Sequence, residues 1–377
     1  MSVEPLKLKE VQALLEPGQT LIQYFVAREE PFLWVVGKDR LNAFTVSVSV
    51  GDLTRKVDVL RKSIAELKPV GEYQSLARNV YELLIGPALP HIKGKELIIV
   101  PHGVLHYLPF QALYSSQGKY LIENYSVNYL SSASLLQFTK AKRRQMGQKV
   151  LAVGNPNLGG TRAQLPLAEL EAKEIRTLYS QAALLVKEEA TEERVKSLSA
   201  ESNILHFATH AELHAEDPLS SAILLAKNGK EDGRLEVREI FEMDLKASLV
   251  VLSGCETGLG KLSSGDEFVG LTRAFIYAGT PSVMASLWKV DDGSTAHLMS
   301  NFYKNLKSMT KVEALRQAQL ELIRGGRSSD LLARRGVGGI GKLGEVPEGR
   351  PLSQGPVSIS ISHPYFWAPF ILVGDGK

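Results

Sequence analysis

The sequence predicts an α/β fold in which helices flank a mostly parallel sheet. Short apolar runs of strand length alternate with amphipathic stretches of helix length, and this alternation is typical of parallel sheets that are covered on both faces. Of the 377 residues, 44% are hydrophobic and 23% are charged, which are ordinary globular values. They exclude a disordered, collagen-like or coiled-coil chain.

The first third of the chain is predicted to form a compact α/β unit. Apolar runs and turn signals distinguish its strands, while one-sided apolar spacing indicates its helices. The expected strands are 21–27, 32–37, 42–50 and 96–100, and the expected helices are 52–67 and 73–84.

A polar, basic stretch at 140–148 marks the expected boundary between two domains, 1–145 and 146–377. Its densest run, KAKRR, is read as a solvated linker rather than a phosphate-binding site. Strands and helices alternate again after it. The expected strands are 149–154, 182–187, 204–208, 248–253, 281–287 and 367–373, and the expected helices are 167–179, 191–198, 266–278, 293–306 and 312–323.

A polar segment at 325–358 interrupts this alternation. It is rich in Gly, Ser, Arg and Pro and is too long for an ordinary connection, so we expect a mobile surface loop. A neutral insertion and a regulatory or self-cleaved loop both remain open.

Composition also restricts the compartment and the partners. Cys255 is the only cysteine, which excludes a disulfide within the chain and a zinc site made of several thiolates. No signal peptide and no membrane-spanning apolar run is recognised, so we expect a cytoplasmic protein without membrane contact. The net charge of +3 is not concentrated, and no direct nucleic-acid binding is expected.

Two predicted strands end in reactive residues. The sequence ILHFATH places His210 just beyond one strand, and LVVLSGCETG places Cys255 in a glycine-flanked turn after another. Functional groups gather at the carboxyl ends of strands in such sheets, and a thiol with a pKa near 8.5 needs a base at neutral pH. If the two strands are neighbours, His210 and Cys255 form a Cys–His dyad. We interpret His206 as a buried structural residue and His214 as a weaker candidate.

Spacing argues against other readings of this turn. A P-loop fails because five residues separate Gly254 from Gly260-Lys261 and leucine follows. A phosphatase-type loop needs arginine where Lys261 stands, and lysine lacks the planar fork. The glycines at 154–159 have the wrong spacing for a dinucleotide fingerprint.

An ordered series of motifs resembles the CHAT-domain family of caspase-like and separase-like cysteine peptidases. The motifs are LIIVPHGVLHYLPFQAL, HFATHA, DPLSSAILL, LVVLSGCETG, GDEFVGLTRAFIYAGTPSVMASLWKVDD and HPYFWAPFILVGD, which together extend over most of the chain. The resemblance implies a caspase-like sheet in 146–377 and a degenerate, pseudo-caspase-like half in 1–145.

The family's dyad falls on His210 and Cys255, the residues that the strand-end argument selects. The resemblance implies an oxyanion hole made by the backbone N–H groups of Ala211 and Cys255, although many members have glycine where Ala211 stands. His102 and Gly103 superficially mimic the caspase His-Gly pair, but no cysteine accompanies them in the first half. We interpret them as a structural turn.

Substrate preference is predicted from residues beyond the strand at 281–287. Asp291 and Asp292 match the stretch that supplies an acidic residue to an arginine pocket in separase-like enzymes, while Asp292 could equally cap the next helix. Trp288 is either a pocket wall or a core residue. Asp266 and Glu267 are expected to cap the helix that they begin and to interact favourably with the positive end of its dipole.

These observations predict a metal-independent cysteine endopeptidase that needs no cofactor. Its substrate would be a protein cut after a basic residue, under the control of a partner such as a helical-repeat module or an effector complex. The alternative is a partner-controlled interaction or scaffold module whose dyad is dormant in the isolated chain.

Overall fold

A computed structural model describes residues 5–28, 30–160, 162–214, 216–254, 266–288, 290, 292–325 and 360–377. The strands are β1 (Gln19–Val26), β2 (Pro31–Val36), β3 (Leu41–Thr45), β4 (Glu96–Val100), β5 (Ser126–Tyr129), β6 (Lys149–Pro156), β7 (Gln181–Lys187), β8 (Ile204–Ala208), β9 (Ala211–Glu212), β10 (Ala222–Leu224), β11 (Arg234–Glu236), β12 (Leu249–Ser253), β13 (Ser282–Ser286) and β14 (Phe370–Gly374). The α-helices are α1 (Leu8–Leu14), α2 (Val50–Ala65), α3 (Val70–Leu84), α4 (Leu121–Asn124), α5 (Leu135–Ala141), α6 (Pro166–Leu178), α7 (Glu192–Ser199), α8 (Val237–Ile240), α9 (Asp266–Ala278), α10 (Asp292–Asn305), α11 (Lys311–Gly325) and α13 (Pro364–Trp367). Within these ranges, no helix is both long and apolar enough to cross a membrane.

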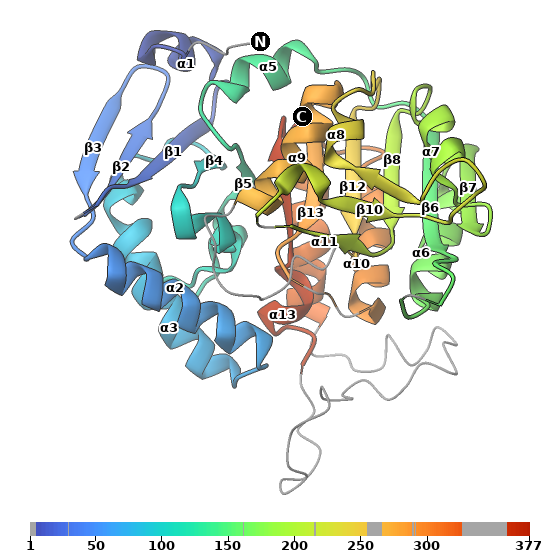
Figure 1. Cartoon of the computed structure of the whole chain (residues 1–377). Coiled ribbons are helices and arrows are strands. Elements are labelled where there is room, and N and C mark those ends of the chain that lie inside the picture. Colours follow the sequence, from blue (N-terminus) through green and yellow to red (C-terminus); the bar gives the residue numbers. More distant parts are fainter. Residues whose placement is uncertain are drawn as a thin grey trace, which may run out of the picture.

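The main sheet has eleven strands in the order β3-β2-β1-β4-β5-β14-β13-β12-β8-β6-β7 (Figure 1). β1, β4, β5 and β14 run in one direction, while β13, β12, β8, β6 and β7 run in the other. Of its ten strand pairs, seven are parallel and three are antiparallel. The predicted α/β class with a mostly parallel sheet is therefore confirmed.

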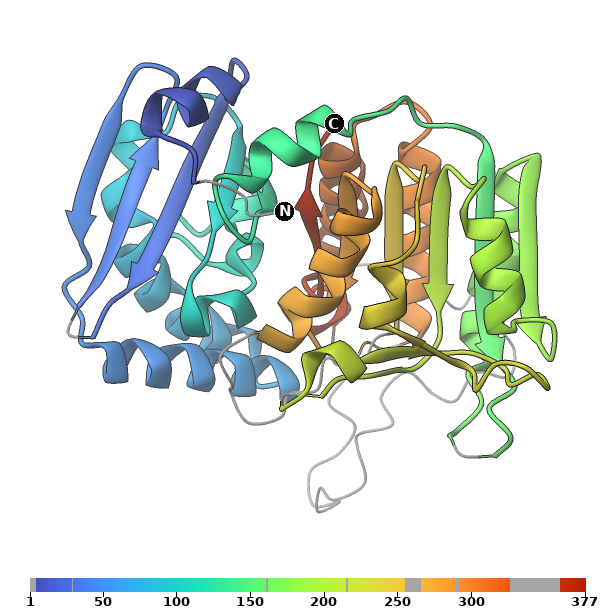
Figure 2. The same cartoon turned by 45° about the horizontal axis from the view of Figure 1, so that its top comes forward.

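Helices cover both faces of the C-terminal part of the sheet (Figure 2). His206 lies beside Tyr303 of α10, whereas the ring of the next residue, Phe207, packs 6.0 Å from that of Phe275 in α9. Because consecutive strand residues point to opposite faces, α10 and α9 must cover opposite faces of β8. All five residues of β8 and of β12 are buried, and for β12 the apolar run SLVVLS predicts this burial.

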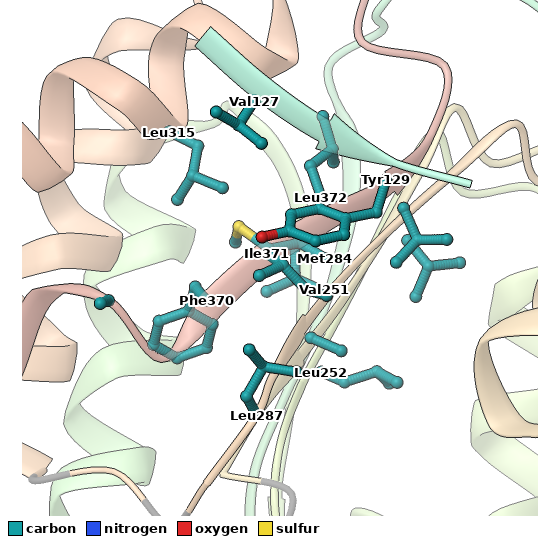
Figure 3. Packing of buried hydrophobic residues seen from close by; sticks show 14 of the residues in the cluster. Val127, Tyr129, Val251, Leu252, Met284, Leu287, Leu315, Phe370, Ile371 and Leu372 are labelled. Atoms are coloured by element: carbon teal, nitrogen blue, oxygen red, sulfur yellow. The ribbon is translucent and has the colours of Figure 1, made fainter. Parts of the chain in front are cut away.

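The two halves of the chain meet at the pair formed by β5 and β14. Val127 and Tyr129 of β5 pack with Leu372 of β14 and Met284 of β13 in one buried cluster (Figure 3). The amide of Asn128 also donates to the carbonyl of Gly374 at 2.9 Å. The main sheet and the main hydrophobic core thus run through both halves, and the division at residue 145 remains a prediction.

The basic stretch around residue 143 differs from the expected solvated linker. The guanidinium of Arg143 donates to both carboxylate oxygens of Asp375 at 2.8 and 2.6 Å, and Arg144 donates to the carbonyl of Leu245 at 3.1 Å. These cations satisfy protein acceptors and tie the end of α5 to the C-terminal half. Local sequence does not reveal these hydrogen bonds, because the acceptors lie 232 and 101 residues away along the chain.

Element boundaries follow local chemistry. β3 ends at Thr45, earlier than the expected strand at 42–50, because Ser49 accepts the backbone N–H of Asp52 and caps α2. β5 and the three-stranded sheet β11-β10-β9 were not predicted, since their strands have two to four residues and carry little periodicity. The expected loop at 325–358 lies outside the described residues except for Gly325, which ends α11.

Candidate active site

The carboxyl ends of β8 and β12 meet at one edge of the sheet. The strands are adjacent and parallel, with Ala208 opposite Ser253, so the condition on which the predicted dyad depends is met. His210 follows β8 by two residues, and Gly254 follows β12 by one. The chain segments that carry the predicted base and the predicted nucleophile therefore leave the sheet side by side.

Gly254 forms a close contact beside the predicted base. Its φ is +97°, a conformation that side chains rarely adopt, and a Cβ placed there would lie 3.3 Å from the carbonyl oxygen of Thr209. Thr209 immediately precedes His210. Cys255 immediately follows Gly254, but Cys255 itself lies outside the described residues, as does Asp291.

The ring of His210 is oriented by a backbone carbonyl. Its Nε2 lies 2.9 Å from the oxygen of Ala163, which belongs to the segment before α6. A carbonyl oxygen only accepts hydrogen bonds, so Nε2 must be the protonated nitrogen. In the neutral ring Nδ1 then carries the lone pair and is the nitrogen that can receive a proton.

The backbone N–H of Ala211 points away from its sheet. The N–H of Leu224 donates to the carbonyl of His210 at 2.9 Å, which makes residues 210 and 224 a hydrogen-bonded pair. Bonded and non-bonded pairs alternate in an antiparallel ladder, so the next pair, Ala211 with Ile223, is non-bonded. Since β9 is an edge strand among the described residues, this N–H is directed outward from the β9–β10 ladder.

His206 occupies a buried polar cluster instead of the sheet edge. It is 0% exposed, with Nδ1 3.0 Å from the hydroxyl of Tyr303 and Nε2 2.9 Å from the carboxylate of Glu171. Burial raises the pKa of Tyr303 well above its ordinary value, so this hydroxyl stays protonated. The interpretation of His206 as a buried structural residue is confirmed.

Trp288 follows β13 and is 1% exposed. Its indole N–H donates to the carbonyl of Tyr365 at 3.2 Å, and its ring is part of the main core. Of the two roles considered for Trp288, pocket wall and core residue, this burial agrees with the core residue. Contact between Trp288 and a substrate remains a prediction. Asp292 is the first residue of α10, and Asp266 and Glu267 begin α9.

His102 lies far from this edge. It follows β4, which runs opposite to β8, so the two histidines leave the sheet at opposite edges. Its Nδ1 accepts the backbone N–H of Val26 at 3.2 Å, and its ring packs 4.8 Å from that of Phe25. These contacts agree with the structural turn that we expected.

An ionic cluster beside His210 was not found from the sequence. The carboxylate of Glu212 in β9 contacts the guanidinium groups of Arg234 and Arg162. Hydrogen bonds from Arg234 and then Arg162 lower the pKa of Glu212, which therefore stays ionised. Arg162 immediately precedes Ala163, so the cluster also holds the segment that orients the histidine.

One group of possible metal ligands lies within the described ranges. It brings the carboxylate oxygens of Glu192, Glu231 and Glu239 within 4.8 Å of one another. The ammonium of Lys196 lies 2.6 Å from Glu192 and 2.7 Å from Glu239. It also lies 3.7 Å from Glu231, so one ammonium group pairs with all three carboxylates and we interpret the group as an ion-pair cluster.

Comparisons with known proteins identify one family. The sequence model of the CHAT domain matches residues 74–375. Tetratricopeptide repeat protein 28 of Homo sapiens is 26% identical over 354 residues, covering 79% of this chain and 13% of that protein. The Mus musculus protein of the same name is also 26% identical, with the same coverage. This chain therefore spans only a small part of these relatives.

Solved structures share the fold. The Saccharomyces cerevisiae separase in the separase–securin complex superposes with a TM-score of 0.61 over 97% of this chain and 31% of that chain. The sequence identity is 11%, so the likeness concerns the fold alone. The predicted caspase-like, separase-like architecture is thereby confirmed.

Proposed function

The chain belongs to the CHAT-domain family, and from this premise we propose that it is a cysteine endopeptidase in which His210 and Cys255 form the dyad. The observation that carries the proposal is the orientation of His210. Its Nε2 is held by the carbonyl of Ala163, which leaves Nδ1 as the basic nitrogen. Gly254, which precedes the thiol, lies against the residue before this histidine.

In the proposed first step, Nδ1 of His210 takes the proton of the Cys255 thiol. The sulfur then attacks the scissile carbonyl carbon, and the carbonyl π electrons move to oxygen. As the C–N bond breaks, the imidazolium returns the proton to the leaving amine. Water hydrolyses the resulting thioester with His210 again as the base, which restores the thiol.

The proposed oxyanion donors are the backbone N–H groups of Ala211 and Cys255. The outward direction of the Ala211 N–H supports this role, because a donor already used in the β9–β10 ladder could not bind the oxyanion. Such donors are typically worth roughly 3–4 kcal/mol each in the transition state. The side chain at residue 211 is not involved, so alanine in place of glycine is compatible with the role.

For the substrate, we propose a protein cleaved after a basic residue. Asp291 and Asp292 follow β13, which runs parallel to β8 and β12, so their segment starts from the same edge as the dyad. A carboxylate removed from water selects a cationic side chain. A single cysteine suits a reducing compartment, and we propose the cytoplasm as the place of action.

The second candidate is a partner-controlled module whose dyad is dormant in the isolated chain. It is favoured by the curated relatives, of which this chain covers 13% and whose name states that they contain tetratricopeptide repeats. These repeats are stacked helix pairs, which suggests a helical-repeat protein as the regulating partner.

Alkylation of Cys255 by iodoacetamide tests the dyad directly. We expect Cys255→Ala to abolish labelling and peptide cleavage, and His210→Gln to slow both. His214→Gln is the matched control, since His214 is an exposed histidine four residues further along. Equal labelling rates for the His210 and His214 variants would refute the dyad. Slow labelling of the wild type that a partner accelerates would favour the dormant module.

Cleavage profiling with a peptide library tests the substrate preference. We expect Asp292→Ala, Asp291→Ala or the double variant to lose a preference for arginine or lysine before the scissile bond. An unchanged profile in the double variant would remove these residues from the specificity pocket.

A further inference from the structure

The segment that carries Ala163 is anchored at its C-terminal end by one buried side chain. Asn155 lies in β6, at its carboxyl end, and is 2% exposed. Its Oδ1 accepts the backbone N–H of Leu165 at 2.8 Å, two residues after Ala163. Its Nδ2 donates to the carboxylate of Glu169 in α6 at 3.2 Å.

Both bonds of Asn155 are directional. The carboxylate of Glu169 can only accept, so it fixes the NH₂ group on its own side and turns the amide oxygen toward Leu165. The backbone of Asn155 has φ +49°, in the left-handed region that asparagine tolerates better than most residues. Position 155 therefore combines a backbone shape and a two-sided side chain that few residue types supply.

Other contacts hold the rest of the segment. Lys187 donates to the side chain of Gln164 at 2.7 Å and lies 3.2 Å from Glu169. On the other side of Ala163, Arg162 lies 2.9 Å from Glu212. Gln164 and Arg162 are exposed, so solvent competes with their polar contacts, whereas the Asn155 bond to Leu165 is removed from solvent on the Asn155 side.

We propose that Asn155 is a positioning residue for the dyad, an inference that rests on the proposed function. By holding Leu165, Asn155 fixes the carbonyl of Ala163 against Nε2 of His210 and so keeps the basic lone pair on Nδ1. In this role Asn155 acts through the Ala163 carbonyl and not on the reacting atoms. Its effect passes through the tautomer of His210.

The tautomer can be measured without activity. In the 377-residue chain labelled with ¹⁵N-histidine and carrying Cys255→Ala, the imidazole ¹⁵N shifts report which nitrogen is protonated, and His210→Gln assigns the signal. We expect Nε2–H in the otherwise unchanged protein. Asn155→Gly, which keeps the left-handed backbone but removes the amide, should lower this preference about fivefold, the effect of one net hydrogen bond. Asn155→Asp combined with Glu169→Gln keeps the acceptor for Leu165 and lets residue 169 donate to the new carboxylate, so this double variant should retain the preference.

Asn203→Gly is the matched control. Its Oδ1 accepts the backbone N–H of Lys149 at 3.2 Å, at the opposite end of β6 from Asn155. This variant should leave the His210 tautomer unchanged. Glu169→Ala provides a second route if Asn155→Gly does not fold, since it frees the Asn155 amide to rotate, and it should shift the tautomer in the same direction.

In the protein that retains Cys255, the alkylation rate at neutral pH should fall about fivefold for Asn155→Gly and stay near wild type for the double variant Asn155→Asp with Glu169→Gln. A His210 tautomer that is unchanged in Asn155→Gly, or in Glu169→Ala where only that variant folds, would overturn the proposal. If labelling of the wild type does not depend on His210, the proposed function fails instead, and the tautomer still decides the role of Asn155.

Discussion

Replacing Gly254 by alanine tests the close contact between Gly254, the residue before Cys255, and Thr209. Gly254 has φ +97°, and the added Cβ would lie 3.3 Å from the oxygen of Thr209. The left-handed backbone costs an alanine roughly 1–2 kcal/mol. Thr209 cannot yield freely, because its hydroxyl donates to the carbonyl of Leu224 at 2.8 Å, so crowding adds about 1 kcal/mol. We expect a total loss of about 2–3 kcal/mol in the free energy of unfolding.

Gly159→Ala separates the two contributions. Gly159 also has a positive φ, +63°, but no atom lies within 4 Å of its ideal Cβ. This variant should lose only the backbone part, roughly 1–2 kcal/mol. Urea denaturation of both variants measures the difference, which the contact with Thr209 predicts to be about 1 kcal/mol.

The same pair of variants reports on the thiol. A shift of about 1 Å in a reacting group can cost on the order of 100-fold in rate. We expect Gly254→Ala to slow the alkylation of Cys255 at least about tenfold relative to Gly159→Ala, because in the proposed dyad a shift of the chain at residue 254 would carry the sulfur away from His210. Equal stability and equal labelling in the two variants would refute the close approach of Gly254 to Thr209.

Three further predictions concern stability. Burial lowers the pKa of Lys311 to about 8, whereas its value in the unfolded chain is near 10.4. Between these two pH values the unfolded chain binds more protons than the folded one, so the free energy of unfolding should rise with pH. Urea midpoints at pH 7.5 and 10 should show this rise in the wild type, and the same rise in Lys311→Met would contradict the assignment to Lys311. Leu372→Ala, at a fully buried position of β14, should cost about 2–5 kcal/mol in urea unfolding, and a loss below about 1 kcal/mol would argue against the shared core. Arg234 lowers the pKa of Glu212 in the folded protein, so the stability from this pair is fully present above the unfolded-state pKa near 4.3 and is lost as pH falls through the lowered folded-state pKa. In thermal melts at a series of acidic pH values, Glu212→Gln should weaken the fall of the melting temperature with falling pH. An unaltered fall would count against the pair.

The sequence by itself determined the secondary structure of the central strands and the residues that could carry chemistry. The run LVVLS forms β12 and is buried at every position, and it contains no glycine or proline that would favour a turn instead of a strand. Its glycine-flanked cysteine and the histidine after β8 were identifiable because strand ends can be read from local apolar patterns. The resemblance of the ordered motifs then indicated the family.

Contacts between remote segments could not be read in the same way. The order of the strands places β14 between β13 and β5, which joins the two halves, yet nothing in Val373 or Tyr129 specifies that pairing locally. The burial of Trp288 was likewise not readable from its local sequence, which fits both a core residue and a pocket wall.

The tertiary structure also decided what surrounds the predicted base. Ala163 meets His210 from 47 residues away through a backbone oxygen, which every residue type possesses and no sequence pattern can single out. The direction of the Ala211 N–H depends on the register of β9 against β10. Local periodicity fixes which face a side chain takes, whereas register and backbone contacts are set only when distant segments pack together.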